Sequence, residues 1–356
     1  MPVSKPFQNI LVIGPNIGMG GVERASCNVA NGLQSLGHKV TYLALIPEEP
    51  FFHLDAEYVE PKDFNENRMN FSKTLQFIRH HVKQIQPDTI LSFTKFYAAT
   101  ANLALLGTRF GIVVSERSSP LYRWPFKIEF IARLSFWLKR PKAVISQTKI
   151  ASHYHQKYYG KTQYYVIPNP VREIKKYPEL KREKTILAVG RFHDHCKGFD
   201  LLVKAFNLVE NSQWRLVFAG GTKAQGNYLL DLAKEDKKDR IEFLGVVRDM
   251  DRLYARAGIF TMPSRSEGFP NALAEAMSAG CCCVSFDFIA GASDMIRNRK
   301  NGVLVPPQDI EQLAKEIDCL IKDEASRITY QSEAVKTRQL LKQEVITRKY
   351  QAVLSE

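Results

Sequence analysis

The chain has 356 residues, 45% of them hydrophobic and 24% charged, which is typical of a soluble globular protein with two domains and excludes a disordered or fibrous one. Its formal net charge of +13 at pH 7 favours an anionic partner: nucleic acid, a phosphorylated small molecule or an acidic membrane surface. No apolar run approaches ~18 residues and the first residues do not resemble a signal peptide, so we expect a cytoplasmic protein without a membrane span.

In chain order, the first half alternates short apolar runs with amphipathic segments, a pattern that predicts a parallel, doubly wound sheet. The expected helices are Val22–Leu36 and Phe71–Gln86. The expected strands are Asn9–Gly14, His38–Ile46, Thr89–Phe93, Gly111–Ser115, Ala143–Ser146 and Gln163–Ile167.

A Pro-Asn-Pro sequence at 168–170 and a charged stretch up to Lys184 then indicate a linker. After it the pattern starts again, with a helix from about Phe199 to Glu210 and a last helical tract at Ala325–Leu354. The strands expected here are Thr185–Val189, Arg215–Ala219, Ile241–Leu244, Ile259–Met262 and Cys282–Phe286.

The sequence therefore predicts an α/β protein of two Rossmann-like, doubly wound parallel-sheet domains. We place them at 1–167 and 168–339, and expect a helix at about 340–356 to pack back on the first domain. Such sheets bind ligands at the carboxyl ends of their strands, so we expect the two domains to face a common cleft.

Six cysteines occur, three of them consecutive at Cys281–Cys283, and none has C-x-x-C spacing. We expect reduced, buried thiols, with the consecutive run packed in the core. The segment His193–Cys196 (HDHC) contains metal-ligand residue types, but nothing else in the sequence completes a site, so we expect no metal.

Two glutamates, Glu267 and Glu275, stand eight residues apart in SRSEGFPNALAEAM, with a Gly-Phe-Pro-Asn turn between them. With Pro270 as the first helical residue, the following amides from Asn271 onward would form a helix N-terminus suited to phosphate. One carboxylate could then hold a ribose and the other a second sugar. The alternative is a capping glutamate and a solvated one.

Arg191 and Lys197 stand in the loop between a predicted strand and helix of the second domain (VGRFHDHCKGFDLL). Two cations at the carboxyl edge of a sheet suit a diphosphate and could neutralise a departing nucleotide without a metal. The alternative is a pair of solvated surface bases.

These motifs together with GGVERA at Gly20–Ala25 resemble the retaining glycosyltransferases of family 4, which have the GT-B fold, over nearly the whole chain. The sequence is most similar to bacterial transferases of capsule, O-antigen and lipid-linked glycan assembly. The resemblance implies a nucleotide-diphosphate sugar as donor, which we expect to be UDP-linked with a GDP-linked sugar as the alternative, and a saccharide acceptor, which we expect to be lipid-linked. We expect no metal or other cofactor. We expect a cytoplasmic protein, with a peripheral position on the inner face of the cell membrane as a hypothesis that rests on segment 117–142.

The resemblance further assigns a role to each site residue. Arg191 and Lys197 would bind the donor diphosphate and stabilise the leaving group, Glu267 would support the oxocarbenium ion, and Glu275 would hold the ribose. Backbone groups would contact the base, the phosphates, the sugar or the acceptor at Val247, Gly268, Phe269, Pro270, Asn271, Gly20 and Gly21.

Arg117 stands where relatives often carry a histidine, after Ser115 and Glu116. A guanidinium cannot act as a base but can bind a phosphate or a donor hydroxyl, so we count Arg117 among the catalytic candidates. Gly220 and Gly221 replace a common Gly-Asp-Gly sequence, which removes one carboxylate.

The segment 117–142 carries seven basic residues, one acidic residue and many aromatic ones. If Phe126–Leu138 is helical, Phe126, Phe130, Leu134 and Trp137 share a face that suits an anionic membrane surface. The alternative is an ordinary helix packed on the first sheet.

Three other functions remain open from the residues alone. A GT-B nucleotide-sugar epimerase would use the same donor site without an acceptor, and a non-catalytic nucleotide-sugar-binding protein would keep the site without turnover. A nucleic-acid-binding module would need a recognition helix or stacking aromatic residues on a basic face, and no such motif is present. The resemblance favours a retaining hexosyltransferase.

Overall fold

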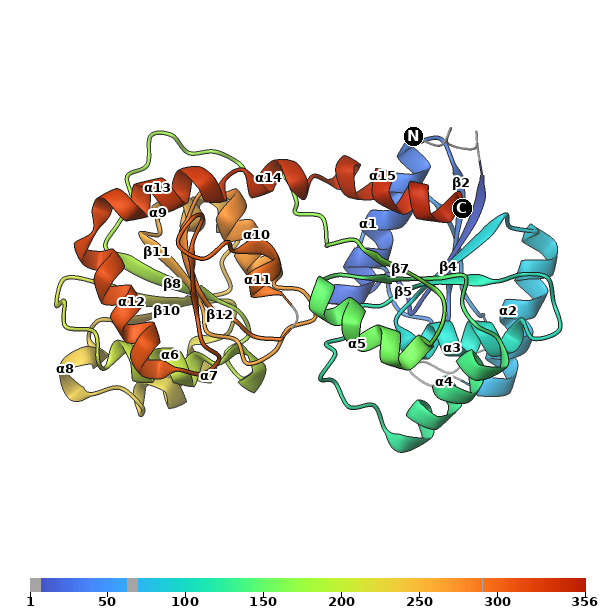
Figure 1. The fold of residues 1–356 in the computed structure, drawn as a ribbon, viewed down its shortest axis with the longest axis horizontal. Helices are drawn as coiled ribbons and strands as arrows, with labels where there is room; N and C mark the ends of the chain where they lie inside the picture. Colours follow the sequence, from blue (N-terminus) through green and yellow to red (C-terminus); the bar gives the residue numbers. More distant parts are fainter. Residues whose placement is uncertain (1–7, 63–69, 290) are drawn as a thin grey trace. The chain divides into compact units, whose positions relative to one another are not determined.

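The chain forms two compact units, one comprising Met1–Asn169 with Gln343–Glu356 and the other Pro170–Lys342. The structure, a computed structural model, describes residues 8–62, 70–289 and 291–356 (Figure 1). Residues 1–7, where the sequence lacks a signal-peptide pattern, lie outside the described part.

The first unit is built on a seven-stranded sheet with the order β3-β2-β1-β4-β5-β6-β7. All its neighbouring strands pair in parallel. The strands are β1 Asn9–Gly14, β2 Lys39–Ala44, β3 Glu57–Val59, β4 Thr89–Phe93, β5 Ile112–Ser115, β6 Ala143–Ser146 and β7 Gln163–Val166. The helices are α1 Gly21–Ser35, α2 Phe71–Ile85, α3 Lys95–Ala104, α4 Phe126–Leu138, α5 Lys149–Tyr159 and α15 Gln343–Leu354.

Helices cover both faces of this sheet, with α1 and α15 on one side and α2, α3 and α4 on the other (Figure 1). Strands that are buried on both faces read as continuous apolar runs, and β1 (NILVIG) is buried from its second residue onward. The predicted doubly wound parallel sheet is therefore confirmed for this unit.

The last helix, α15, packs against α1 of the first unit. A Cβ atom at Gly32 on α1 would lie only 2.2 Å from Thr347 Oγ1 on α15, so the glycine allows this close approach. Gln343 Nε2 donates a hydrogen bond of 2.7 Å to the Asn28 carbonyl, which fixes the start of α15.

The second unit is built on a six-stranded parallel sheet with the order β10-β9-β8-β11-β12-β13. Its strands are β8 Thr185–Val189, β9 Arg215–Ala219, β10 Ile241–Gly245, β11 Ile259–Met262, β12 Cys282–Phe286 and β13 Val303–Val305. Its helices are the short η1 His195–Lys197, α6 Phe199–Phe206, α7 Lys223–Leu230, α8 Glu235–Lys238, α9 Met250–Arg256, α10 Asn271–Ser278, α11 Ala292–Met295, α12 Ile310–Lys322, α13 Glu324–Ala334 and α14 Thr337–Leu340.

The three consecutive cysteines lie in the core of the second unit, at the start of β12, and each is fully buried. Burial raises the pKa of Cys282 to about 12, so its thiol stays protonated and unreactive at neutral pH. Core packing of this run is confirmed. The expectation of buried thiols is wrong for Cys196 and Cys319, which are exposed.

Several observed elements were not predicted from the sequence, and one predicted helix is divided. The strands β3 and β13 were not predicted, since three residues give too short a pattern. The unpredicted helices are α3, which is apolar on most sides, and α5, α7, α8, α9, α11 and α12. The last tract, predicted as one helix, is three helices with breaks at residues 335–336 and 341–342.

The charged stretch after Pro170 is attached to the second unit, and is not the free linker that its composition suggests. The Val171 amide donates to the Leu341 carbonyl at 2.8 Å. The Arg182 guanidinium donates to the carbonyls of Tyr254, Ala257 and Gly280 at 2.6, 2.9 and 2.7 Å. Arg182 thus satisfies backbone carbonyls at and just after the C-terminal ends of α9 and α10 inside this unit.

Both sheets reverse their strand order at the same place, between the first and fourth strands of each unit. Such a switch point is where parallel sheets bind ligands, at the carboxyl ends of the strands. In the second unit it lies between β8 and β11. Gly198, which follows β8 with a φ of +65°, has its missing Cβ position 2.0 Å from the Pro263 carbonyl oxygen that follows β11.

We expect Gly198→Ala to lower the free energy of unfolding by about 2–4 kcal/mol, because it adds a backbone clash to the cost of a left-handed residue. Gly280→Ala is the matched control: its φ is +75° but its nearest neighbour lies at 3.6 Å, so the loss should be about 1–2 kcal/mol. Chemical denaturation followed by the fluorescence of buried Trp214 measures both. Equal losses would contradict the importance of the backbone contact.

Candidate functional site

The loops after β8 and β11 bring Lys197 and Glu267 together at the switch point of the second unit. Lys197 Nζ lies 2.9 Å from Glu267 Oε1 and 3.1 Å from Oε2, so the ammonium bridges both oxygens. The two side chains are 20% and 11% exposed, and this partial burial strengthens their attraction relative to a surface pair. Two predicted site residues from different loops therefore form one charged pair.

A second ion pair holds the same two loops. Arg265 donates to both carboxylate oxygens of Asp200, at 2.7 and 2.6 Å. Its amide also donates to the Cys196 carbonyl at 2.7 Å. Ser264 Oγ donates to Glu267 Oε1 at 2.8 Å, which fixes the carboxylate from the β11 side.

Arg191 is more exposed than Lys197 and pairs with Asp194 in its own loop, at 2.9 Å. Partial burial works to raise the pKa of Asp194, but the hydrogen bonds from Arg191 and from the Cys196 amide outweigh it, and the pKa is lowered. Asp194 is therefore ionised and also accepts from the first turn of η1. These contacts account for Asp194 as part of the loop's own structure.

The Gly268–Asn271 turn precedes α10, which begins at Asn271, so Pro270 is the N-cap residue and not the first helical one. The Asn271 amide donates to the Phe269 carbonyl at 2.9 Å within the turn. The predicted contact of this turn with a phosphate or sugar stays a prediction. Phe269 is buried and anchors the turn in the unit.

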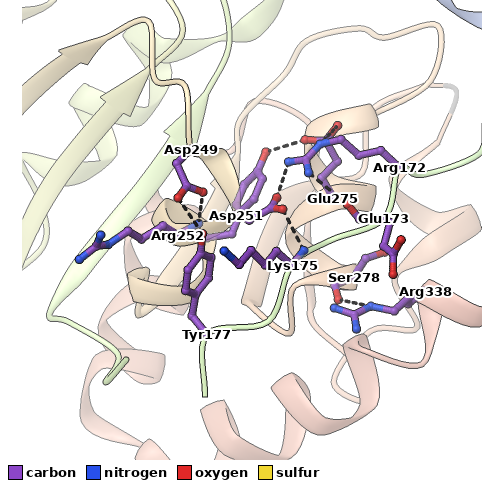
Figure 2. A network of polar contacts seen from close by, with 11 residues as sticks. Arg172, Glu173, Lys175, Tyr177, Asp249, Asp251, Arg252, Glu275, Ser278 and Arg338 are labelled. Atoms are coloured by element: carbon purple, nitrogen blue, oxygen red, sulfur yellow. Dashed lines mark hydrogen bonds and ion pairs between the residues drawn. The ribbon is translucent and has the colours of Figure 1, made fainter. Parts of the chain in front are cut away.

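Glu275, about one turn after the start of α10, contacts partners other than those of Glu267 (Figure 2). Its Oε2 accepts from Tyr254 Oη at 3.3 Å, and its Oε1 lies 3.9 Å from Arg172 Nε. Burial raises the pKa of Tyr254 well above its usual value, so the phenol stays protonated and donates a hydrogen bond to Glu275. The two glutamates of the motif are thus held separately.

Val247 lies in the turn after β10 and is half-buried, beside Val246, which is 81% exposed. The strand is irregular between Phe243 and Gly245, where its register shifts against β9. This turn lies at the carboxyl edge of the second sheet, and β9 separates its strand from β8, whose following loop carries Lys197.

In the first unit, Gly20 is the N-cap residue of α1 and Gly21 its first residue. A Cβ atom at Gly21 would meet no atom within 4 Å, whereas one at Gly20 would lie 2.0 Å from a carboxylate oxygen of Glu23, so the open space is at Gly21. The loop follows β1, at the switch point of the first sheet.

Arg117 follows β5 in the first unit and is 7% exposed. Its guanidinium donates to Ser115 Oγ at 3.1 Å, to Asn169 Oδ1 and to Tyr350 Oη on α15. It also lies 5.4 Å from the centre of the Phe93 ring. These contacts give Arg117 a structural task, and its predicted role as a donor ligand stays a prediction.

The sequence singled out Lys197, Glu267 and Glu275 but missed the side chains that fix them. Arg265 stands inside the quoted motif, and its pairing with Asp200 could have been suspected from the adjacent loops. Tyr254 and Arg172 lie 21 and 103 positions before Glu275, and no spacing rule links such distant residues.

The exposed apolar residues of α4 form a distinct surface of the first unit. Phe126, Phe130 and Trp137 are 82%, 59% and 76% exposed. Two of the seven basic residues of 117–142 turn inward, because Arg117 is buried and Lys139 donates to three backbone carbonyls. In the part of the chain that the structure describes, no helix is long and apolar enough to cross a bilayer.

Comparison with known proteins gives two family matches. Residues 19–173 match the model described as Glycosyltransferase Family 4, and residues 183–323 match the model described as Glycosyl transferases group 1. Between them the two models cover most of both units.

Similar proteins include bacterial glycosyltransferases. An uncharacterized glycosyltransferase of Haemophilus influenzae is 28% identical over 316 residues, 86% of this chain and 89% of the relative. A Campylobacter jejuni enzyme is 27% identical over 342 residues, 90% of this chain and 91% of the relative. It is named GalNAc-α-(1→4)-GalNAc-α-(1→3)-diNAcBac-PP-undecaprenol α-1,4-N-acetyl-D-galactosaminyltransferase.

Among solved structures, Anabaena HepE in complex with UDP has a TM-score of 0.80 at 18% identity. The match covers 97% of this chain and 99% of that one. At this identity the likeness establishes the fold.

We expect Arg117→Met to lower the free energy of unfolding by about 2–4 kcal/mol, because it removes a buried cation together with its hydrogen bonds to β5 and α15. Arg133→Met is the control, since Arg133 pairs with Glu129 on the surface and is 69% exposed; its loss should stay below about 0.5 kcal/mol. Calorimetric unfolding of both variants measures the difference. If Arg117→Met lowers the free energy of unfolding as little as Arg133→Met does, Arg117 does not have the structural role inferred from its contacts.

Proposed function

The chain belongs to the group 1, family 4 glycosyltransferases, which are retaining enzymes of the GT-B fold that use nucleotide-sugar donors, and from this premise we propose its specific reaction. It transfers a hexose from a UDP-linked donor to a hydroxyl of a lipid-linked saccharide during the synthesis of a bacterial surface glycan. The family assignment favours this transferase over the epimerase and the non-catalytic binding protein.

The observation that carries the proposal is the pair of Lys197 and Glu267 at the switch point of the second sheet. A cation and a carboxylate held 2.9 Å apart at the carboxyl ends of parallel strands suit a ligand that is anionic at one end and rich in hydroxyls at the other. A nucleotide-diphosphate sugar has this chemistry. Lys197 would take the diphosphate, and Glu267 the sugar.

The remaining site residues extend this assignment along the donor. Arg191 would share the diphosphate with Lys197, and Glu275 would hold the ribose hydroxyls. The turns at Val247 and Gly268–Asn271 would contact the base and the phosphates or sugar. In the first unit, the backbone at Gly20 and Gly21 would approach a phosphate or the acceptor, and Arg117 would bind a phosphate or a donor hydroxyl.

Retention at the anomeric carbon follows from a front-face reaction. The acceptor oxygen forms its bond to that carbon on the face from which the diphosphate departs, and the acceptor's proton passes to the leaving phosphate oxygen. Lys197 and Arg191 stabilise the negative charge that builds on the leaving group. Glu267 stabilises the oxocarbenium ion, so no residue need form a covalent intermediate.

The comparisons support the choice of donor and acceptor. UDP is the nucleotide bound to Anabaena HepE. The name of the Campylobacter jejuni relative gives a diphosphate-linked undecaprenol saccharide as its substrate. A lipid-linked acceptor of this kind would be met at the cytoplasmic face of a membrane.

The exposed face of α4 supports contact with that membrane. Six apolar side chains on it are exposed: Phe126, Phe130, Ile131, Leu134, Trp137 and Leu138. The opposite side of the helix, with Ala132 and Phe136, is buried in the unit. Exposed bases flank the apolar face at Arg123, Lys127, Arg133 and Arg140, which suits an anionic lipid surface.

We expect Lys197→Ala to lower the rate of sugar transfer by about 10²–10³-fold, because it removes the charge that stabilises the leaving diphosphate. Glu267→Ala should cause a similar loss. A panel of UDP- and GDP-sugars, first scored by thermal shift and then incubated with bacterial lipid extract, identifies the donor, and mass spectrometry detects the product.

Lys204→Ala provides the matched control, since Lys204 is an exposed base on α6. It should transfer sugar at the wild-type rate. Wild-type turnover by Lys197→Ala or Glu267→Ala would contradict the assigned roles. If no nucleotide sugar raises the melting temperature of the protein, the proposed donor is wrong.

The double variant Phe126→Ser/Trp137→Ser should reduce binding to vesicles that contain anionic phosphatidylglycerol at least about tenfold, because it removes two interfacial aromatic side chains. Ile328→Ser/Leu340→Ser is the control, with side chains of 59% and 66% exposure in the second unit. Flotation with anionic and neutral vesicles measures the binding. Equal recovery from both vesicle types would count against the membrane surface.

A further inference from the structure

Arg172 enters the second unit two residues after its first residue, Pro170, and ends beside a predicted donor-binding carboxylate. Its guanidinium reaches two acids at once, with Nη2 on Asp251 Oδ1 and Nε 3.9 Å from Glu275 Oε1 (Figure 2). The pKa of Arg172 is raised, chiefly by its hydrogen bond with Asp251. The guanidinium is therefore a permanent cation between two carboxylates.

Asp251 fixes the position of this cation. It lies in the first turn of α9, and its other oxygen, Oδ2, accepts from the Lys175 amide at 2.9 Å. One carboxylate thus holds both the side chain of Arg172 and the backbone three residues later. Asp251 is 12% exposed on its side chain, so the pair is shielded from water on most sides.

A second contact holds the same segment on the same helix end. Tyr177 Oη donates to Asp249 Oδ2 at 2.7 Å, and Asp249 is also the N-cap residue of α9 through the Arg252 amide. Residues 172–177 are therefore fastened to the start of α9 at two points. The segment that carries Arg172 is ordered by these bonds and not by secondary structure of its own.

Glu275 receives contacts from two directions. Tyr254 Oη, fully buried behind it, donates to Oε2, while the Arg172 guanidinium lies against Oε1. A carboxylate offers about four acceptor sites, so it can bind vicinal hydroxyls while it is also held by protein groups. The hydrogen bond from Tyr254 and the ion pair with Arg172 restrict the orientation of the carboxylate plane, and bidentate binding to a diol needs a fixed orientation.

We propose that Arg172 is a positioning residue for Glu275, so that the nucleotide's ribose hydroxyls are recognised by a carboxylate held between Tyr254 and Arg172. This inference rests on the proposed function, in which Glu275 holds the ribose. Arg172 acts through Glu275 and does not itself contact the nucleotide. Asp251 acts one step further away by holding Arg172.

The test measures nucleotide binding by calorimetry, with UDP and GDP each compared with its 2′,3′-dideoxy counterpart. The dideoxy nucleotides lack the hydroxyls that Glu275 would bind, so they report every other contact. The variants are Arg172→Ala, Arg172→Lys, Asp251→Asn, Glu275→Gln and the double variant Arg172→Ala/Glu275→Gln. Arg256→Ala is the matched control, because Arg256 on α9 pairs with Glu183 outside the network.

We expect Arg172→Ala to weaken binding of the hydroxylated nucleotide about three- to tenfold and that of the dideoxy nucleotide less than about twofold. Glu275→Gln should show the same selectivity with a larger loss, and the double variant should bind no more weakly than Glu275→Gln alone. Arg172→Lys should be intermediate, because an ammonium cannot bridge both acids as the guanidinium does. Asp251→Asn should show the same selective loss of nucleotide binding as Arg172→Ala, and Arg256→Ala should bind both nucleotides as the wild type does.

Two results would overturn the positioning role while leaving the proposed function intact. One is an equal loss for both nucleotides in Arg172→Ala, since that would indicate direct contact with phosphate or damage to the fold. The other is a full additional loss in the double variant, because independent contacts add and a positioning residue does not. Circular dichroism and the melting temperature identify a folding defect in Arg172→Ala. In that case the positioning role is judged from the nucleotide binding of Arg172→Lys and Asp251→Asn.

Failure of the proposed function gives a different pattern. If Glu275→Gln does not distinguish the two nucleotides, the ribose is held elsewhere, and the inference falls with that assignment even if Lys197→Ala still weakens binding. If the wild type binds neither UDP nor GDP, the donor assignment itself falls.

Discussion

The close backbone contact between Gly198 and Pro263 is the constraint on which the site of the second unit depends. It brings together the two loops that follow the switch-point strands β8 and β11, where a side chain at position 198 would have no room. Once the loops touch, Lys197 and Glu267 can pair across them, and Arg265 can reach Asp200. The charged groups stabilise the contact further, but the missing Cβ atom makes it feasible.

Much of the fold could be predicted from the sequence, because buried parallel strands leave long apolar runs such as TILAV and NILVIG, and these were placed almost to the residue. The site was predictable only in part. Lys197, Glu267 and Glu275 belong to short motifs, whereas Tyr254 and Arg172 reach Glu275 through the fold and carry no local pattern. Arg117 shows the opposite error, since a polar residue at a suggestive position proves to be buried among first-unit side chains.

The net charge of +13 is less available to ligands than the composition suggests. Arg182 and Lys139 each donate to several backbone carbonyls, and Lys237, which is 7% exposed, donates to the Val209 carbonyl at 2.7 Å. These cations neutralise the negative ends of backbone segments that would otherwise be buried without donors. The positive charge therefore has a large structural share, and the anion binding that we propose uses the bases of a few loops and of α4.

The packing of α15 on α1 affects the order in which the two units are completed during synthesis. The second unit is one continuous stretch, Pro170–Lys342, so all its residues are present before the last helix is made. The first unit lacks α15 until residues 343–354 have been synthesised, which leaves Gly32 and Asn28 uncovered in the meantime. Domains usually mature from the N-terminus onward, but here the half of the protein that is synthesised first is finished last.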